Sequence, residues 1–410
     1  MSASDFLVIG GGVIGLSIAR ELKRRYADSR VTVLEKEPDT GRHASGRNSG
    51  VLHAGFYYTP DSLKARFTRI GNAALTDYCE ARGLPINQCG KLVVARDQSE
   101  LPALDELLRR GRINGIVLEP VDARQAQAIE PRARTFERAL FSPTTASVDP
   151  GRVVAAMTAD ARAEGVRLET GRRFLRRAAD AVVTDRGRID AGYVVNAAGL
   201  YADRIARAYG FSQRYRILPF KGLYLYSDEP AGAIRTHIYP VPDLRNPFLG
   251  VHFTVAVDGR IKIGPTATPA FWRENYRGLD GFRAGELWDI VRRQARLLLK
   301  SDFDFKRLAV EEIRKHSRAR MVALARELAG GVEPGHYRRW GKPGIRAQLL
   351  DIEQNRLEMD FVIEGDARSL HVLNAVSPAF TCALPFATHV CDEIGRRFGE
   401  ATARPAEAAP

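Results

Sequence analysis

Two histidines of this sequence lie in segments where an imidazole can act on a bound ligand. His53 belongs to the polar, glycine-containing stretch 45–55, and His252 belongs to the β-rich segment 250–254. Imidazole titrates near neutral pH, so each side chain is a candidate general base. Each could equally be a structural histidine that only hydrogen-bonds its surroundings. The residue types alone leave open which of the two is the base.

A glycine-rich turn near the N-terminus predicts a dinucleotide site. Gly10, Gly12 and Gly15 form a G-x-G-x-x-G pattern between an apolar run and a helical pattern. The first glycine permits the tight turn, the second lets a pyrophosphate approach the backbone, and the third lets helix and strand pack closely. Glu35 follows Gly15 by 20 residues, where its carboxylate can accept hydrogen bonds from a ribose.

We expect this cofactor to be FAD. The glycine pattern occurs once, so a second dinucleotide site for a nicotinamide is not expected. A further strand predicted over 189–197 runs into Ala198 and Gly199. Small residues at the carboxyl end of a strand let a cofactor lie against the backbone.

The pattern of elements predicts an α/β fold, α+β overall. The runs 6–9 and 31–34 flank one helix, so their strands must be parallel. Short β-rich runs over 217–263 are typical of an antiparallel sheet. The remaining predicted elements are a strand over 370–375 and helices over 56–83, 99–115, 153–165, 283–329 and 378–398.

We therefore expect a Rossmann-like FAD-binding domain that carries an inserted antiparallel-sheet substrate domain. The FAD-binding domain is predicted to be discontinuous and to comprise residues 1–80, 145–215 and 340–400. The substrate-binding domain is predicted to comprise residues 81–144 and 216–339. Residues 401–410, rich in Ala and Pro, are predicted to form a flexible tail.

Composition excludes several classes of protein. No apolar run is long enough for a transmembrane helix, and glycines interrupt the apolar N-terminus where a signal peptide would be continuous. The four cysteines form no CxxC pair, so we expect no metal site and a reducing, cytoplasmic compartment. The formal net charge of +13 is spread along the chain rather than gathered with aromatics, so nucleic acid is not an expected partner.

Several stretches resemble the L-2-hydroxyglutarate dehydrogenase/oxidase family, within the D-amino-acid oxidase superfamily of flavoproteins. The resemblance covers nearly the whole chain, in order, and its later stretches are more specific than the glycine pattern. These stretches are 45–55 (SGRNSGVLHAG), 219–222 (PFKG), 238–242 (IYPVP), 248–254 (FLGVHFT), 344–348 (GIRAQ) and 377–381 (SPAFT).

The resemblance implies FAD-dependent oxidation of a small L-2-hydroxy acid, such as L-2-hydroxyglutarate, with electrons passed to a quinone, an electron carrier protein or oxygen. It implies cofactor contacts from Gly10, Gly12, Gly15, Glu35, Lys36, Ser45, Arg47, Asn48, Ser49, Ala198, Gly199, Pro378, Ala379, Phe380 and Thr381. It implies catalytic roles for His53, His252, Arg346 and Lys221, with Tyr239 and Tyr276 lining the substrate pocket.

Among these residues, Arg346 is the expected clamp on the substrate's α-carboxylate, because a guanidinium binds a carboxylate bidentately. Lys221 stands where the family often has arginine, so its expected role is a second cation for a distal carboxylate or for the flavin. The 377–381 stretch is expected to begin the last helix and to stabilise the flavin through its N–H groups. Pro385 departs from the family pattern and is expected to kink or restart that helix.

Other functions remain open from the sequence. An amine or amino-acid oxidase or dehydrogenase of the same superfamily would share the fold. A protein that binds FAD without turnover would share its cofactor site. Because family members that feed respiratory chains associate with membranes, the +13 charge also favours peripheral docking on the inner face of an anionic membrane.

Overall fold

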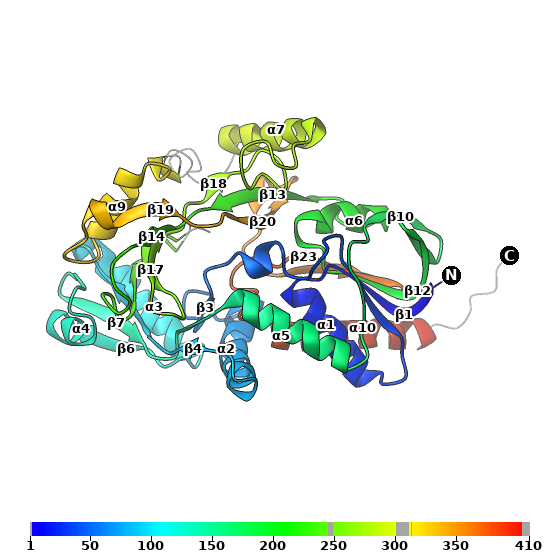
Figure 1. Cartoon of the computed structure of the whole chain (residues 1–410), viewed down its shortest axis with the longest axis horizontal. Coiled ribbons are helices and arrows are strands. Elements are labelled where there is room, and N and C mark those ends of the chain that lie inside the picture. Colours follow the sequence, from blue (N-terminus) through cyan, green and yellow to red (C-terminus); the bar gives the residue numbers. More distant parts are fainter. Residues whose placement is uncertain (1, 245–248, 301–310, 313, 404–410) are drawn as a thin grey trace.

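The computed structural model describes residues 2–244, 249–300, 311–312 and 314–403. The molecule is elongated, with a mostly parallel sheet at one end and a mostly antiparallel sheet at the other (Figure 1). The N-terminus lies at the outer end of the parallel sheet. The prediction of a flexible tail concerns residues that, from 404 onward, lie outside the described residues.

The predicted βαβ unit is confirmed. Strand β1 (Ser2–Ile9) pairs in parallel with β2 (Val31–Leu34) and, on its other side, with β12 (Gly187–Asn196). Helix α1 (Val13–Arg25) makes the connection. Leu7, Val8 and Val33 are fully buried, as expected for strands covered on both faces.

The same sheet is completed by segments from the middle and the end of the chain. Its order is β10-β11-β12-β1-β2-β9, and β23 pairs with both β12 and β22. Helices α1, α5 and α10 pack together against one face, and α6 covers the other. The bounds are β9 Arg167–Glu169, β10 Phe174–Ala178, β11 Ala181–Thr184, β22 Val362–Gly365, β23 Ser369–Asn374, α5 Pro150–Ala163, α6 Ala202–Ala208 and α10 Ala383–Ala403.

The second large sheet has the order β19-β14-β17-β16-β15-β5-β7-β6. Its pairs are antiparallel, as predicted for 217–263, except that β15 and β5 run parallel. These two strands come from distant segments, so no hairpin fixes their direction. The bounds are β5 Lys91–Val94, β6 Glu119–Asp122, β7 Arg138–Ser142, β14 Leu225–Ser227, β15 His237–Pro240, β16 His252–Val255, β17 Ile261–Gly264, β19 Tyr337–Trp340, and for the helices packed around it α3 Leu101–Ile113, α4 Ala123–Ile129 and α9 Arg318–Arg326.

A third sheet lies between the two large ones (Figure 1). Strand β13 (Tyr215–Gly222) pairs along its whole length with β20 (Gly344–Asp351). The two strands come from segments that we predicted to belong to different domains, so the domain division stays a prediction. The remaining elements are β18 Thr268–Pro269, β21 Arg356–Leu357, α7 Ala284–Lys300, and a small sheet of β3 Val51–Leu52, β4 Ile86–Asn87 and β8 Ala146–Val148.

Three predicted helices differ from the structure. The segment 283–329 contains α7 and α9, and residues 315–317 lie outside a helix. Helix α2 (Leu63–Ala81) begins seven residues later than predicted, because the Ser62 hydroxyl caps it by accepting a hydrogen bond from the Ala65 N–H at 3.1 Å. Helix α10 begins at Ala383, so 377–381 forms a turn before it. Pro385 is therefore in the first helical turn, where its missing N–H would have no partner, and α10 begins two residues before it, in line with the predicted restart.

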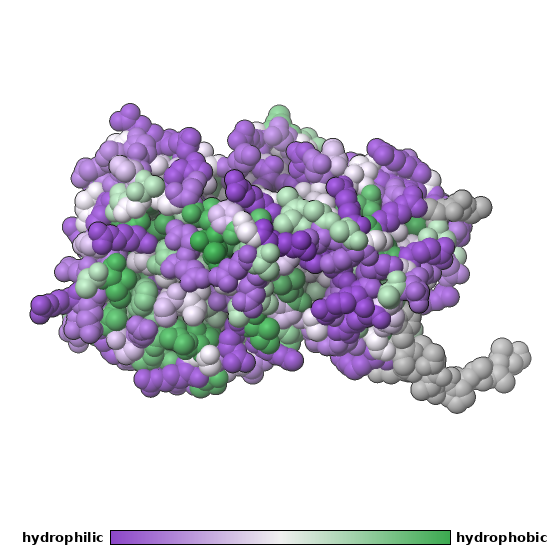
Figure 2. Space-filling view, turned by 60° about the horizontal axis from the view of Figure 1, so that its bottom comes forward, coloured by the Kyte–Doolittle hydropathy of each residue, from purple (hydrophilic) through white to green (hydrophobic). Residues whose placement is uncertain are grey.

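Among the residues that the structure describes, no helix is both long enough and apolar enough to cross a bilayer. Figure 2 shows one face of the molecule, on which hydrophobic residues form separate groups among hydrophilic ones.

Candidate active site

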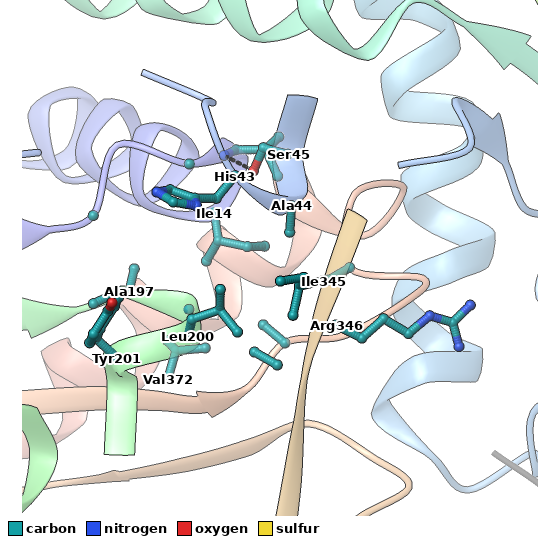
Figure 3. Close-up of a pocket in the computed structure, with 18 of the residues that line it drawn as sticks. Ile14, His43, Ala44, Ser45, Ala197, Leu200, Tyr201, Ile345, Arg346 and Val372 are labelled. Atoms are coloured by element: carbon teal, nitrogen blue, oxygen red, sulfur yellow. Dashed lines mark hydrogen bonds between the residues drawn. The ribbon is translucent and has the colours of Figure 1, made fainter. Parts of the chain in front are cut away.

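A cavity of about 700 Å³ lies where the parallel sheet meets the third sheet. Its walls come from the start of α1, the loop 43–53, the end of β12, strand β20 and the turn 377–381 (Figure 3). Sixteen of the predicted site residues line it. They are Gly10, Gly12, Glu35, Lys36, Ser45, Arg47, Asn48, Ser49, His53, Ala198, Gly199, Arg346, Pro378, Ala379, Phe380 and Thr381.

The glycine turn brings backbone atoms to the cavity wall. Gly10 has φ +117°, and a Cβ there would lie 2.4 Å from the carbonyl oxygen of Ala197. A Cβ at Gly15 would lie 1.9 Å from the carbonyl oxygen of Gly10. Gly15 does not line the cavity, and its lack of a side chain lets the helix approach the strand closely. Side chains at these positions would therefore break the turn.

Glu35 stands at the end of β2, on the cavity wall, as predicted. Its carboxylate accepts hydrogen bonds from the N–H of Gly11 at 2.7 Å and from the N–H of Glu37 at 2.8 Å. These bonds fix the carboxylate beside the glycine turn, where a ribose hydroxyl can reach it.

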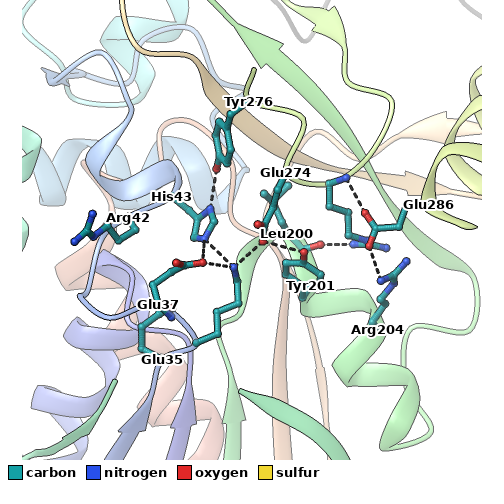
Figure 4. A network of polar contacts seen from close by, with 12 residues as sticks. Glu35, Glu37, Arg42, His43, Leu200, Tyr201, Arg204, Glu274, Tyr276 and Glu286 are labelled. Atoms are coloured by element: carbon teal, nitrogen blue, oxygen red, sulfur yellow. Dashed lines mark hydrogen bonds and ion pairs between the residues drawn. The ribbon is translucent and has the colours of Figure 1, made fainter. Parts of the chain in front are cut away.

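Lys36 contacts Glu37, His43 and Glu274, which belong to the polar network that Figure 4 shows. Its Nζ lies 2.5 Å from Oε1 of Glu37, 2.6 Å from Oε1 of Glu274 and 3.0 Å from Nε2 of His43. Burial acts to raise the pKa of Glu37, but the hydrogen bonds from Lys36 and His43 outweigh it and lower this pKa to about 2. The ligand atoms of Glu37, His43 and Glu274 are close enough to hold a metal ion, but the ammonium already takes the place of that cation.

The loop 43–53 is held by its own polar side chains. The hydroxyl of Ser45 accepts a hydrogen bond from the N–H of Val13 at 2.9 Å and so joins the loop to α1. Asn48 donates to the carbonyl of Ser45 at 2.7 Å. The guanidinium of Arg47 lies 4.4 Å from the ring centroid of Tyr276. The predicted pocket residue Tyr276 therefore contacts this loop and does not line the cavity.

His53 borders the cavity at the inner end of this loop. Its backbone N–H donates to the hydroxyl of Thr381 at 3.2 Å, and its side-chain Nδ1 has no hydrogen-bond partner among the described residues. Burial lowers the pKa of His53 well below its usual value, and the positive charges of Lys91 and Arg346 lower it further. The imidazole is therefore neutral and can accept a proton.

His252 lies deeper than His53 and does not line the cavity. Its ring stacks on the ring of Tyr239 with centroids 3.7 Å apart, and its Nδ1 is 2.8 Å from the carbonyl oxygen of Gly250. Burial lowers the pKa of His252 to about 3, although the Gly250 carbonyl acts to raise it. Tyr239 is buried with it, behind the cavity wall.

The two predicted cations lie on opposite faces of one sheet. In the antiparallel pair of β13 and β20, Arg346 is opposite Phe220, and Lys221 is opposite Ile345. Because side chains alternate along a strand, Arg346 and Lys221 point to different sides. Arg346 lines the cavity, with its side chain directed away from Tyr201 (Figure 3), whereas Lys221 donates to the side chain of Asn275 at 3.2 Å, outside it. The predicted role of Lys221 stays a prediction that this geometry does not support.

Sequence reasoning missed three buried lysines, one of which, Lys91, acts electrostatically on His53. Lys91 has no exposed surface and stands in a fully buried strand, and Lys64 and Lys262 are nearly as deep. Burial lowers the pKa of Lys91 to about 7. The run Lys91-Leu92-Val93-Val94, a lysine opening an apolar strand, was the signal that could have found it. Tyr224, another missed residue, lines the cavity itself.

Comparison with known proteins decides the family. Residues 5–392 match the model of the FAD-dependent oxidoreductase (DAO) family. The chain belongs to this family. Its relatives include the mitochondrial L-2-hydroxyglutarate dehydrogenase of Homo sapiens, 37% identical over 97% of this chain and 90% of the relative. The L-2-hydroxyglutarate dehydrogenase of Escherichia coli strain K12 is 33% identical over 95% of this chain and 93% of the relative. The resemblance predicted from the sequence stretches is confirmed.

Solved structures confirm the predicted fold class of this family member. An FAD-bound L-α-glycerophosphate oxidase from Mycoplasma pneumoniae has a TM-score of 0.77 at 20% identity, covering 96% of this chain and 95% of the other. A glycine oxidase from Geobacillus kaustophilus has a TM-score of 0.73 at 20% identity, covering 97% and 96%.

The cofactor of this oxidoreductase is FAD, and the cavity fits it. At the glycine turn the cavity wall is bare backbone, which a pyrophosphate can approach closely and which a single Cβ would obstruct. Glu35 lies beside this turn, where it can accept hydrogen bonds from the ribose. The cavity continues from there to His53 and Arg346, at the place where a flavin ring would meet a substrate.

Proposed function

We propose that the protein oxidises an L-2-hydroxy acid, with L-2-hydroxyglutarate as the best candidate, to the corresponding 2-oxo acid. The observation that carries this proposal is a neutral imidazole with an unpaired Nδ1, on His53, bordering the same cavity as the guanidinium of Arg346. The names of the bacterial and eukaryotic relatives support the same substrate.

In this reaction the substrate loses a hydride from its α-carbon and a proton from its hydroxyl. His53 accepts the proton at its unpaired ring nitrogen, and Arg346 holds the α-carboxylate so that the α-hydrogen has a fixed direction. FAD, when bound, supplies the acceptor of the hydride. His53 is a better candidate base than His252, because the ring of His252 is stacked on Tyr239 and its Nδ1 is already paired with the carbonyl oxygen of Gly250.

The test is an anaerobic titration of the yellow holoprotein with L-2-hydroxyglutarate. Stoichiometric bleaching of the oxidised flavin band, with 2-oxoglutarate as product, is the expected result. D-2-hydroxyglutarate tests the stereochemistry. L-glutamate and glycine test the amine alternative, which the likeness to glycine oxidase brings forward. If an amine bleaches the flavin and L-2-hydroxyglutarate does not, the proposed substrate class is wrong.

We also propose that the reduced flavin passes its electrons to a quinone or an electron carrier protein, with oxygen as the third candidate acceptor. Steady-state rates with a short-chain quinone, with a one-electron dye and with oxygen alone separate a dehydrogenase from an oxidase. Turnover with oxygen as fast as with the quinone would overturn this preference.

For peripheral membrane association we propose one surface, the α7 surface, defined as Phe271, Leu279, Phe282, Trp288 and Leu299 with Arg277, Arg283, Arg292, Arg296 and Lys300. All ten side chains are exposed, and Trp288 is 76% exposed on the side of α7 opposite the buried Ile290 and Leu297. Figure 1 shows α7 projecting from the rim of the molecule.

An anionic lipid surface suits this mixture best. Tryptophan and leucine enter the headgroup region while arginine and lysine meet lipid phosphates. Two copies of the α7 surface would instead bring five cations against five, which disfavours self-association.

Co-flotation with phosphatidylglycerol vesicles, but not with phosphatidylcholine vesicles, is the expected result. Trp288→Ser with Leu299→Ser should abolish it, whereas Ile113→Ser, at another exposed apolar residue, should not. Equal flotation of all variants, or a dimer in solution that the double substitution dissolves, would overturn the assignment.

A further inference from the structure

Several buried polar atoms near His53 have no hydrogen-bond partner among the described residues. They include Nδ1 of His53, the hydroxyl of Tyr57 and Nζ of Lys91. A buried polar atom without a partner costs about 1–3 kcal/mol, and a charged one costs more. Of the three residues, His53 lines the cavity and the other two do not, and this group of unpaired buried atoms indicates that something other than the chain completes them.

The ammonium of Lys91 is enclosed by aromatic rings. Its Nζ lies 4.5 Å from the ring centroid of Tyr239, 5.1 Å from that of Tyr57 and 5.4 Å from that of Phe56. The rings provide an attractive face for a cation, but they offer it no acceptor of the strength of a carboxylate. No ion pair of Lys91 with an acidic side chain is found among the described residues.

The backbone holds Lys91 firmly in this position. It opens β5, whose two neighbours in the sheet are β15 and β7, and it lies opposite His237 in one pair and Ser142 in the other. The strand continues into Leu92, Val93 and Val94, which are fully buried. A lysine at such a position cannot turn outward to reach water, as a surface lysine does.

Lys91 and Arg346 act on the same histidine. Both positive charges are close enough to His53 to destabilise its protonated form, and Arg346 acts in the same way on His252. They stand on different sheets, Lys91 on β5 and Arg346 on β20. Two separate cations around one candidate base suit a substrate with two separate anionic groups.

We propose that Lys91, with the hydroxyl of Tyr57, binds the second carboxylate of a dicarboxylic 2-hydroxy acid, while Arg346 binds the first. This inference rests on the proposed function and adds to it the residue that selects a dicarboxylate over a monocarboxylate. The carboxylate gives the ammonium its missing partner and accepts the hydrogen bond of the tyrosine. A monocarboxylic acid of the same length leaves both groups unpaired.

The test compares two substrates in one variant. In Lys91→Met, KM for L-2-hydroxyglutarate should rise by roughly 10- to 100-fold, the loss of one charge-assisted bond. The value of kcat/KM for L-2-hydroxypentanoate, which has the same chain length and one carboxylate, should stay the same or rise. Tyr57→Phe should show the same selectivity with a smaller change.

A matched control is Lys262→Met, because Lys262 is also a buried lysine but donates to the carbonyl of Ser49 at 2.9 Å. Lys262→Met should change kcat/KM for both substrates by the same factor. Equilibrium binding gives a second measurement without turnover: glutarate should perturb the flavin spectrum of the wild-type holoprotein, and Lys91→Met should weaken glutarate but not butyrate.

The outcomes separate the two proposals. If wild type reduces its flavin with neither hydroxy acid, the proposed function fails. If wild type turns over and Lys91→Met lowers kcat/KM equally for both substrates, Lys91 is structural. If Lys91→Met changes neither, the ammonium is solvated by buried water only. Either of the last two results overturns the assignment of Lys91 alone.

Discussion

Two polar clusters of this molecule, one half-buried near the glycine turn and one fully buried near His53, differ in how far the chain satisfies their hydrogen-bonding groups. The Lys36 cluster comprises Lys36, Glu37, His43, Glu274 and Tyr276, and its charges are neutralised by direct hydrogen bonds. The Lys91 cluster comprises His53, Tyr57, Lys91, Tyr239 and His252, holds no carboxylate, and contains three of the unpaired buried atoms.

The difference separates scaffold from site. A cluster with all its partners rigidifies the fold and gains nothing from a ligand. A cluster that lacks anions and acceptors gains from an anionic ligand whatever it lost on burial. The Lys36 cluster therefore holds two loops together beside the glycine turn, whereas the Lys91 cluster is where we expect the substrate.

The largest expected effect is at His53, the candidate base, and it tests the division into scaffold and site. His53→Asn should lower kcat for L-2-hydroxyglutarate by roughly 10²- to 10⁴-fold, because a positioned base contributes that much. His43→Asn, a histidine of the Lys36 cluster, should cost less than about tenfold in kcat, since its imidazole acts on Lys36 and not on the substrate. Rapid-reaction flavin reduction measures both, with FAD content as the control for folding. Equal losses would contradict the division into scaffold and site.

Arg346 provides the next largest effect. Arg346→Lys keeps the charge but loses the planar pair of donors, so kcat/KM should fall by roughly 10- to 100-fold. The loss should appear with L-2-hydroxyglutarate and L-2-hydroxypentanoate alike, because both carry an α-carboxylate. A loss confined to the dicarboxylate would exchange the roles of Arg346 and Lys91.

The sequence predicted the surroundings of the glycine turn better than it predicted Lys91. The glycine turn, Glu35 and the strand that leads to Ala198 and Gly199 form from local patterns, and all of them border the cavity as predicted. Lys91 was not predicted as a site residue, because its surroundings are formed by β15 and by the rings of Tyr57 and Tyr239, which come from distant parts of the sequence. The motif at Lys221 likewise does not contain the pairing of β13 with β20, which places Lys221 opposite Ile345 and on the other side of the sheet from Arg346.

Replacing Lys91 and replacing Lys36 should change the free energy of unfolding in opposite directions. The folded-state pKa of Lys91, about 7, is below its ordinary value of 10.5, so the unfolded chain binds more protons between these pH values. Its burial therefore destabilises the substrate-free protein at pH 7, and the penalty fades as pH rises toward 10.5. Lys91→Met should raise the free energy of unfolding at pH 7 by a few kcal/mol at most, on the order of the shift.

Lys36→Met should lower the free energy of unfolding at pH 7. Glu37 has a lowered pKa, so it contributes stability above pH 4.5 that is lost as pH falls toward 2, and this contribution depends on Lys36. Because Lys36 is 21% exposed and Glu37 29% exposed, the loss should be about 1 kcal/mol. Denaturant unfolding of both variants at pH 7 measures the two signs. A destabilised Lys91→Met variant would mean that the chain already satisfies this lysine.

The smallest expected effect is in the pH dependence of the reaction. Burial and two neighbouring cations lower the pKa of His53, so in the free enzyme the imidazole remains unprotonated at pH 6.5 and somewhat below. The acid limb of kcat/KM reports this group. With L-2-hydroxypentanoate, which does not need Lys91, kcat/KM should therefore change by less than about twofold between pH 7.5 and pH 6.5. In Lys91→Met, where one of those cations is gone, the acid limb should move to higher pH. An acid limb already centred above pH 6.5 in wild type would mean that an anionic group lies beside His53 and stabilises its protonated form.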